Sequence, residues 1–289
     1  MKPHPIPFLG LPDNQSTLET AAVALVPFGY EGGVSYGKGT AAAPTAILRA
    51  SQYLELYDEV IEDEPCRIGL ATVAEPAIPQ APEDMLETLE TLTDALLNQK
   101  KFVAVIGGDH SITTGYVRAL ARRYKNFGVL QLDAHSDLRE SYEGSPLSHA
   151  CTMARLREIT PHTLQIGIRS MCAEEASLVK AQDLALCTMH RYRRGGFDLE
   201  AELARLPEQL FITVDVDVFD WSVIASTGTP EPGGMLWDEA MNLLQVVFRS
   251  KMVIGFDVVE LAHRDHDANS PFATAKLIYK MIGMRFAGG

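Results

Sequence analysis

The sequence predicts an α/β fold in which a mainly parallel sheet is packed between two layers of helices. Short apolar runs of strand length recur along the chain, and most are continuous rather than alternating, as in strands buried on both faces. Segments with apolar residues at helical spacing lie between these runs, and strands that alternate with helices indicate a parallel sheet. No change of composition and no linker divides the chain, so we expect a single domain over residues 1–289.

The expected strands and helices alternate along most of the chain. Strands are expected at 22–28, 102–106, 127–132, 163–168, 184–187, 210–214 and 252–256. Helices are expected at 83–98, 112–124, 199–206, 237–248 and 271–284. The connection between the strands at 127–132 and 163–168 has roughly thirty residues, which is long for a plain loop, so we expect it to be functional.

The composition excludes several classes of protein. Hydrophobic residues make up 46% and charged residues 22%, and no apolar run is long enough to span a membrane or to act as a secretory signal. The net charge is −13 with no basic run, which argues against nucleic-acid and membrane binding and is compatible with a cationic substrate or metal ions. The four cysteines form no CxxC pair, which favours free thiols in the cytoplasm.

Polar residues follow three of the expected strands, at the strand ends where open parallel sheets bind ligands. They are His110 after the strand at 102–106, Asp133, His135 and Asp137 after the strand at 127–132, and Asp215 and Asp217 after the strand at 210–214. Alternate side chains of an extended segment share a face, so those at 133–137 and at 215–217 should converge. Polar surface turns and a structural histidine are the alternatives.

Two histidines and four aspartates make an oxygen-rich ligand set without a thiolate. Such a set suits Mn²⁺ better than structural Zn²⁺, and it could also bind Ni²⁺. Four carboxylates are neutralised by two divalent ions, and six ligands are too many for one ion that keeps an open position. Two-metal sites generate a hydroxide nucleophile and polarise the substrate. The sequence therefore predicts a site for two Mn²⁺ ions.

Taken in order, these motifs resemble those of the ureohydrolases, the family of arginase and agmatinase. They are GGDH at 107–110, DAHSD at 133–137, QIGIR at 165–169, DVDVFD at 215–220, STGTPEPGG at 226–234 and DVVE at 257–260. The similarity covers nearly the whole chain from Val23 onward. The resemblance implies an arginase-like fold of three α/β/α layers with an eight-stranded sheet, and a homo-oligomer, often a trimer or hexamer.

The resemblance also implies a role for each expected ligand. One Mn²⁺ would be bound by His110 and Asp137, the other by His135 and Asp217, and both would be bridged by Asp133 and Asp215. A hydroxide that bridges the two metals would attack the substrate, and Asp137 would hold it by a hydrogen bond.

His149 and Glu260 match the catalytic loop histidine and the guanidinium-binding glutamate of the family. His149 would contact the substrate and pass a proton to the leaving amine, a task suited to imidazole. Glu260 would pair with the substrate guanidinium, which a carboxylate can bind in bidentate fashion. Without the resemblance, a surface histidine and a capping carboxylate are the plainer interpretations. Asp257 is expected to face elsewhere and to be structural.

Departures from the arginase pattern favour agmatine as the substrate. Arg139 and Cys172 replace an asparagine and an aspartate typical of arginases, and Glu231 is the agmatinase-like choice. Residues 137–144 together with 147–151 look like those of many prokaryotic agmatinases, and an acidic site mouth would favour a dication without a carboxylate. We therefore expect hydrolysis of agmatine to putrescine and urea, a step of polyamine biosynthesis.

Other activities and other classes of protein stay open. Guanidinobutyrase, aminopropylagmatine ureohydrolase, guanidine hydrolase and arginase differ in what the pocket holds beyond the guanidinium. Trp221 and the loops at 222–226 and 261–268 have no assigned role, and neither has Arg139. Residues 32–38 fit the GxxxxGK pattern of a P-loop nucleotide-binding protein, although Gly39 stands where Ser or Thr is needed. A nucleophilic pair of Cys151 and His149 and a binding-only protein are further alternatives.

Overall fold

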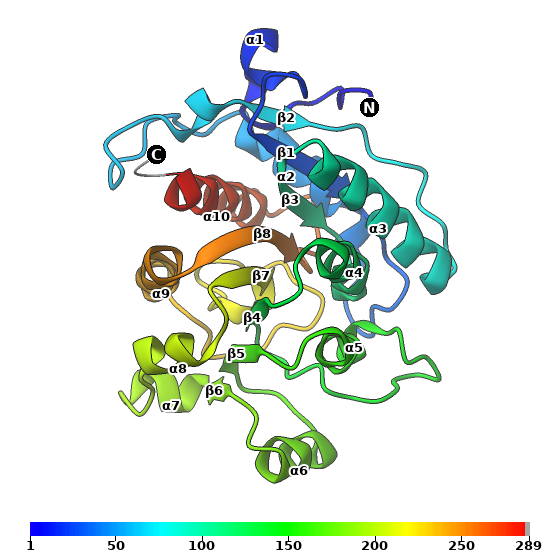
Figure 1. The fold of residues 1–289 in the computed structure, drawn as a ribbon, viewed down its shortest axis with the longest axis vertical. Coiled ribbons are helices and arrows are strands. Elements are labelled where there is room, and N and C mark those ends of the chain that lie inside the picture. Colours follow the sequence, from blue (N-terminus) through cyan, green and yellow to red (C-terminus); the bar gives the residue numbers. More distant parts are fainter. Residues whose placement is uncertain (287–289) are drawn as a thin grey trace.

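The computed structural model describes residues 1–286 and confirms the expected α/β architecture (Figure 1). Eight strands form one sheet in the order β2-β1-β3-β8-β7-β4-β5-β6, and every neighbouring pair is parallel. The strands are β1 Val23–Phe28, β2 Leu70–Thr72, β3 Phe102–Gly107, β4 Gly128–Leu132, β5 Thr163–Ile168, β6 Leu186–Thr188, β7 Gln209–Asp215 and β8 Met252–Val259. Residues 287–289 of the expected domain lie outside the described residues.

Helices cover both faces of the sheet and form the two outer layers (Figure 1). On one face, α3, α4 and α5 share a hydrophobic core with the sheet, and on the other α2, α8, α9 and α10 do so. The helices are α1 Asp13–Ser16, α2 Ala43–Ser51, α3 Pro82–Asn98, α4 Thr113–Arg123, α5 Thr152–Ile159, α6 Ala173–Ala181, α7 Met189–Arg193, α8 Leu199–Arg205, α9 Trp237–Ser250 and α10 Asn269–Phe286. Within residues 1–286, no helix combines the length and the hydropathy that crossing a membrane requires.

All strands and helices expected from the sequence are present, but β2, α1, α2, α5, α6 and α7 had not been identified. β2 has three residues, too few for a pattern to be visible. α2 has nine residues and carries a proline in its first turn, which leaves few positions from which a helical period can be counted. α6 has no apolar stripe, because the residue that it buries is the carboxylate Glu175.

The order of the strands explains how distant motifs meet at one edge of the sheet. β8 and β7 lie between β3 and β4, although β8 is the last strand of the chain. β3 pairs with β8 from Ala104↔Phe256 to Ile106↔Val258. Because all strands are parallel, the carboxyl ends of β3, β8, β7 and β4 lie side by side. The segments that follow these four strands therefore form one site.

Candidate active site

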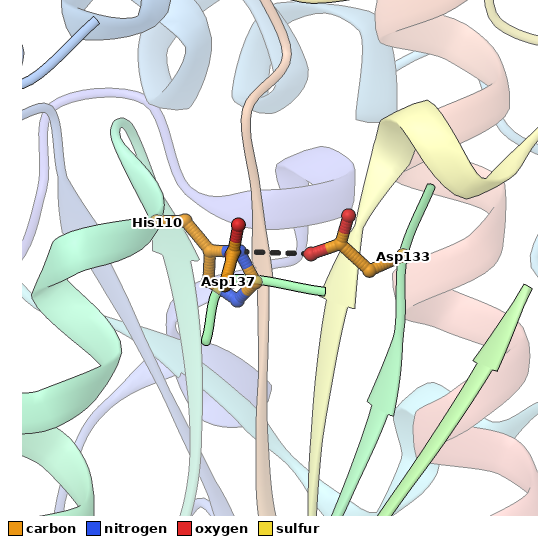
Figure 2. Close-up of side chains that lie close together, drawn as sticks. All are labelled: His110, Asp133 and Asp137. Carbon is orange, nitrogen blue, oxygen red and sulfur yellow. Dashed lines mark ion pairs between the residues drawn. The ribbon is translucent and has the colours of Figure 1, made fainter. Parts of the chain in front are cut away.

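His110 lies at the end of β3, where two glycines let the chain turn. A Cβ at Gly108 would lie 2.1 Å from the carbonyl oxygen of Tyr30, so only glycine fits there. His110 is fully buried, and its Nδ1 lies 3.2 Å from Oδ2 of both Asp133 and Asp137. Figure 2 shows these three side chains facing one another, with the ion pair between His110 and Asp133 dashed. The structure thus brings two separate motifs together around one ring nitrogen.

His135 is the centre of a second group that also contains Asp133. Its Nδ1 lies 2.8 Å from Oδ2 of Asp217 and 3.6 Å from Oδ1 of Asp133. Each group, His110–Asp133–Asp137 and Asp133–His135–Asp217, has one ligand atom per residue within 4.8 Å of the others. Asp215 completes the set, because its Oδ2 lies 3.4 Å from Nδ1 of His110. All six expected ligands therefore lie in one place, and each oxygen of Asp133 faces a different histidine.

The local conformation that brings the aspartates together differs from the expected extended chain. Val216–Val218 form a 3₁₀ turn, in which Oδ1 of Asp215 accepts the backbone N–H of Asp217 at 2.9 Å. Asp137 has a φ of +52°, in the left-handed region that is uncommon for residues with a side chain. A turn and a left-handed backbone position, rather than strand alternation, therefore direct Asp217 and Asp137 inward, whereas Asp215 is still the last residue of β7.

The charges at this site are unbalanced in a way that a cation would correct. Burial, together with the charge of Asp133, raises the pKa of Asp137 to about 6, and burial with Asp217 and Asp133 raises that of Asp215 well above its usual value. Burial acts to lower the pKa of His135, but the charges and hydrogen bonds of Asp217 and Asp133 together outweigh it, and the pKa rises to about 12. Among the described residues, His110 Nδ1 and Asp217 Oδ2 are buried without a hydrogen-bond partner. The donor set and these two unpaired atoms fit divalent cations.

Glu260 and His149 lie beside this cluster, as the sequence predicted. Glu260 follows β8 with a φ of +65°, and its Oε1 accepts the backbone N–H of His110 at 2.7 Å. Nδ1 of His149 lies 3.9 Å from the same oxygen. Burial, together with the charge of Asp109, raises the pKa of Glu260 well above its usual value. His149 also lines a cavity of about 260 Å³, together with Asp137 and Asp215.

Two residues that support the site had not been identified as functional from the sequence. Glu175 of α6 is buried, and its carboxylate accepts hydrogen bonds from Ser136 Oγ, the Leu138 N–H and the Cys172 N–H at 2.7–2.9 Å. Arg169 donates from one guanidinium nitrogen to the carbonyl oxygens of Asp217 at 2.6 Å and Glu231 at 2.9 Å. The position of Arg169 in a recognised motif was a usable signal, whereas nothing in the sequence around Glu175 distinguishes it.

Two alternatives from the sequence find no support in the geometry. In the segment that fits a P-loop, the N–H groups of Gly39 and Thr40 donate to Oε2 of Glu31, at 2.5 and 2.7 Å, and so are not free for a phosphate. Cys151 is buried, and burial raises the pKa of its thiol to about 11, which disfavours the thiolate that a nucleophile needs.

Asp257 gives a testable pH dependence in the metal-free protein. It is fully buried in β8, and burial raises its pKa to about 6, with partial relief from His110 and the hydroxyls of Thr213 and Thr113. A raised pKa stabilises the fold while the group is protonated, and this contribution is lost as the pH rises through the folded-state value. We expect the loss to be about 3 kcal/mol between about pH 4 and pH 7.

Thermal unfolding of metal-free wild type and of the Asp257→Asn variant across this pH range checks the expectation. The variant cannot ionise here, so its stability should fall less than that of the wild type as the pH rises. Equal pH dependence of the two proteins would contradict the assigned burial of the charge.

The comparisons with known proteins agree with the motifs and the geometry. A sequence model described as the Arginase family matches residues 21–283, nearly the whole chain. The chain belongs to the arginase family. This ureohydrolase is 40% identical over 273 residues to the N(1)-aminopropylagmatine ureohydrolase of Synechocystis sp.. The aligned region covers 91% of this chain and 89% of that protein. The resemblance stated from the sequence is thereby confirmed.

Other members of the arginase family show the same likeness. The agmatinase of Pyrococcus horikoshii is 31% identical over 258 residues, covering 88% of this chain and 89% of that protein. The crystal structure of the agmatine ureohydrolase of Thermoplasma volcanium matches with a TM-score of 0.86 at 28% identity, over 93% of this chain and 92% of that one. The arginase-like fold expected from the sequence is confirmed by this match.

Proposed function

We propose that this protein binds two divalent metal ions and hydrolyses the guanidinium group of a cationic substrate with release of urea. The observation that carries the proposal is the position of Asp133 between His110 and His135, which makes one buried carboxylate common to two ligand groups. The ligand set favours Mn²⁺, with Ni²⁺ as the second candidate. His110 and Asp137 would hold one ion, His135 and Asp217 the other, with Asp133 and Asp215 shared.

Two bound divalent ions would supply a water nucleophile at neutral pH and polarise the guanidinium. Glu260 would orient that guanidinium. Its Oε1 accepts the backbone N–H of His110 at 2.7 Å, and its Oε2 lies near Gly228, where a Cβ would crowd it at 3.4 Å. The absence of a side chain at Gly228 keeps Oε2 from being crowded, and a carboxylate can pair with a planar guanidinium.

His149 would give a proton to the leaving amine. Its Nδ1 lies 3.9 Å from Glu260, and its Nε2 is buried without a hydrogen-bond partner in the described part of the chain. A ring nitrogen of His149 is thus free to meet a substrate nitrogen next to the guanidinium-binding carboxylate.

The substrate that we propose first is N(1)-aminopropylagmatine, with agmatine, the substrate expected from the sequence, as the second candidate. The relative with 40% identity carries the first name, and a relative with 31% identity is named agmatinase. The cavity is lined by the carboxylates of Asp137, Asp215 and Glu175, of which the first two are proposed metal ligands. Arg139 also lines it, with its guanidinium 5.1 Å from the ring centre of Tyr142 and 4.0 Å from Glu175.

Urea release by the purified protein tests this proposal. The protein would be loaded with Mn²⁺ or Ni²⁺ and given N(1)-aminopropylagmatine, agmatine, 4-guanidinobutyrate, arginine and guanidine. The highest kcat/KM is expected for N(1)-aminopropylagmatine. A preference for agmatine would support the second candidate, and a preference for 4-guanidinobutyrate or arginine would indicate that Arg139 binds a substrate carboxylate. No urea from any compound with either metal would refute the proposed activity.

A further inference from the structure

Four buried polar residues form a single row across the middle of the sheet. Asp257 of β8 is the register partner of Thr213 of β7, Thr213 that of Gln131 of β4, and Gln131 that of Gln165 of β5. Each side chain is at most 1% exposed. Strands buried on both faces are normally apolar, so four polar side chains at one level are unexpected. We call these residues the polar row.

The polar row lies directly beneath the proposed metal ligands. Two residues further along the chain, Gln131 is followed by Asp133, just past the end of β4, and Thr213 by Asp215, the last residue of β7. Two residues before them, Val129 and Phe211 belong to the hydrophobic core under α3, α4 and α5. The polar row therefore separates the apolar core from the ligand cluster.

The two glutamines form a directed chain of hydrogen bonds that ends on Asp133. Nε2 of Gln165 donates to Oε1 of Gln131 at 2.5 Å and to the carbonyl oxygen of Ser136 at 2.6 Å. Nε2 of Gln131 donates to Oδ2 of Asp133 at 2.6 Å. Because a carboxylate only accepts, each amide is held in one orientation. The chain fixes both the side chain of Asp133 and the backbone that leads to Asp137.

Thr213 acts on His110 from the other half of the polar row. Nε2 of His110 lies 2.9 Å from Oγ1 of Thr213. Because this ring nitrogen is engaged by the hydroxyl, the ring is held with Nδ1 toward the three aspartates. Nδ1 is therefore the nitrogen left for a cation.

We propose that Gln165, Gln131 and Thr213 are positioning residues that fix the orientation of Asp133 and of the His110 ring for metal binding. The inference rests on the proposed two-metal site but concerns residues that touch neither metal nor substrate. Groups that orient ligands in this way contribute about 10–100-fold to metal affinity in other metalloproteins.

The test is a calorimetric titration of the metal-free protein with Mn²⁺. Thr213→Val keeps the shape of the side chain and removes the hydroxyl, and Thr213→Ser restores a hydroxyl. Gln131→Met removes the donor to Asp133 with little change in volume. Thr93→Val is the matched control, because Thr93 is fully buried in α3, remote from the site, with an unpartnered hydroxyl.

Thr213→Val should weaken one of the two Mn²⁺ sites by about 10–100-fold, and Thr213→Ser should regain most of the affinity. Gln131→Met should weaken both sites, because both share Asp133. Thr93→Val should leave both dissociation constants unchanged. The melting temperature of each metal-free protein, measured in parallel, separates weakened metal binding from a general loss of stability.

Thr213→Val and Gln131→Met proteins that bind two Mn²⁺ ions with wild-type affinity would overturn the inference and leave the proposed function intact. The same conclusion would follow if their affinity fell only in proportion to a lower metal-free melting temperature. A wild-type protein that binds neither Mn²⁺ nor Ni²⁺ would instead refute the proposed function itself.

Discussion

Replacing Asp133 by asparagine should abolish urea release, with a fall in kcat of at least about 10³-fold. Each carboxylate oxygen faces a different histidine, Oδ2 toward His110 at 3.2 Å and Oδ1 toward His135 at 3.6 Å. Asparagine keeps the shape but carries no charge and has only one acceptor oxygen. Both metal sites should therefore lose affinity together. Urea production and the number of Mn²⁺ ions bound per chain are the two measurements.

Asp198→Asn provides the control for this experiment. Asp198 begins α8, where its side chain accepts the N–H of Ala201, and asparagine caps a helix equally well. The control should keep full activity and both metals. An Asp133→Asn protein with wild-type activity would show that the shared carboxylate is dispensable and would remove the main support for a two-metal site.

Replacing Glu260 by glutamine should lower kcat/KM by about 10²–10³-fold while both metal ions stay bound. In the wild type, Oε1 of Glu260 accepts a hydrogen bond from the backbone N–H of His110 at 2.7 Å. The amide oxygen of glutamine can still accept this hydrogen bond. The amide nitrogen would take the place of the oxygen that faces the substrate, and an N–H donor repels a guanidinium. We expect the loss to be similar for every substrate of the panel, since all carry the same group.

Steady-state kinetics together with Mn²⁺ titration checks this expectation. Glu158→Gln, on the exposed side of α5, is the control, because this glutamate forms only a surface ion pair with Arg155. If Glu260→Gln lost its metals as well, Glu260 would be a support of the metal centre. Unchanged kcat/KM would exclude a role of Glu260 in substrate binding.

The sequence predicts the layers of the fold, but it does not predict the strand order that brings the site residues together. Continuous apolar runs such as residues 102–106 are sufficient to identify buried parallel strands. The order of those strands is not contained in such patterns, and the insertion of β8 and β7 between β3 and β4 decides which motifs meet. The family motifs supplied that information indirectly.

The candidate ligands were found from their spacing after the strands, but two features of the site are not visible in the sequence. Asp137 turns inward through a left-handed backbone conformation rather than by strand alternation. Gln131 and Thr213 are visibly polar within apolar runs, but their alignment with Gln165 and Asp257 depends on a register between four strands. Local propensities carry no information about such a register.

The ends of β3 and β8 are fastened to each other in both directions. The N–H of Glu260 donates to the carbonyl oxygen of Gly108, and the N–H of His110 donates to the carboxylate of Glu260, each at 2.7 Å. The reacting end of a substrate would thus be held by the rigid frame of the sheet, whereas its other end would meet loops such as residues 137–151. Insertions and substitutions in those loops can redirect such an enzyme toward new guanidino compounds without disturbing the bond that it breaks.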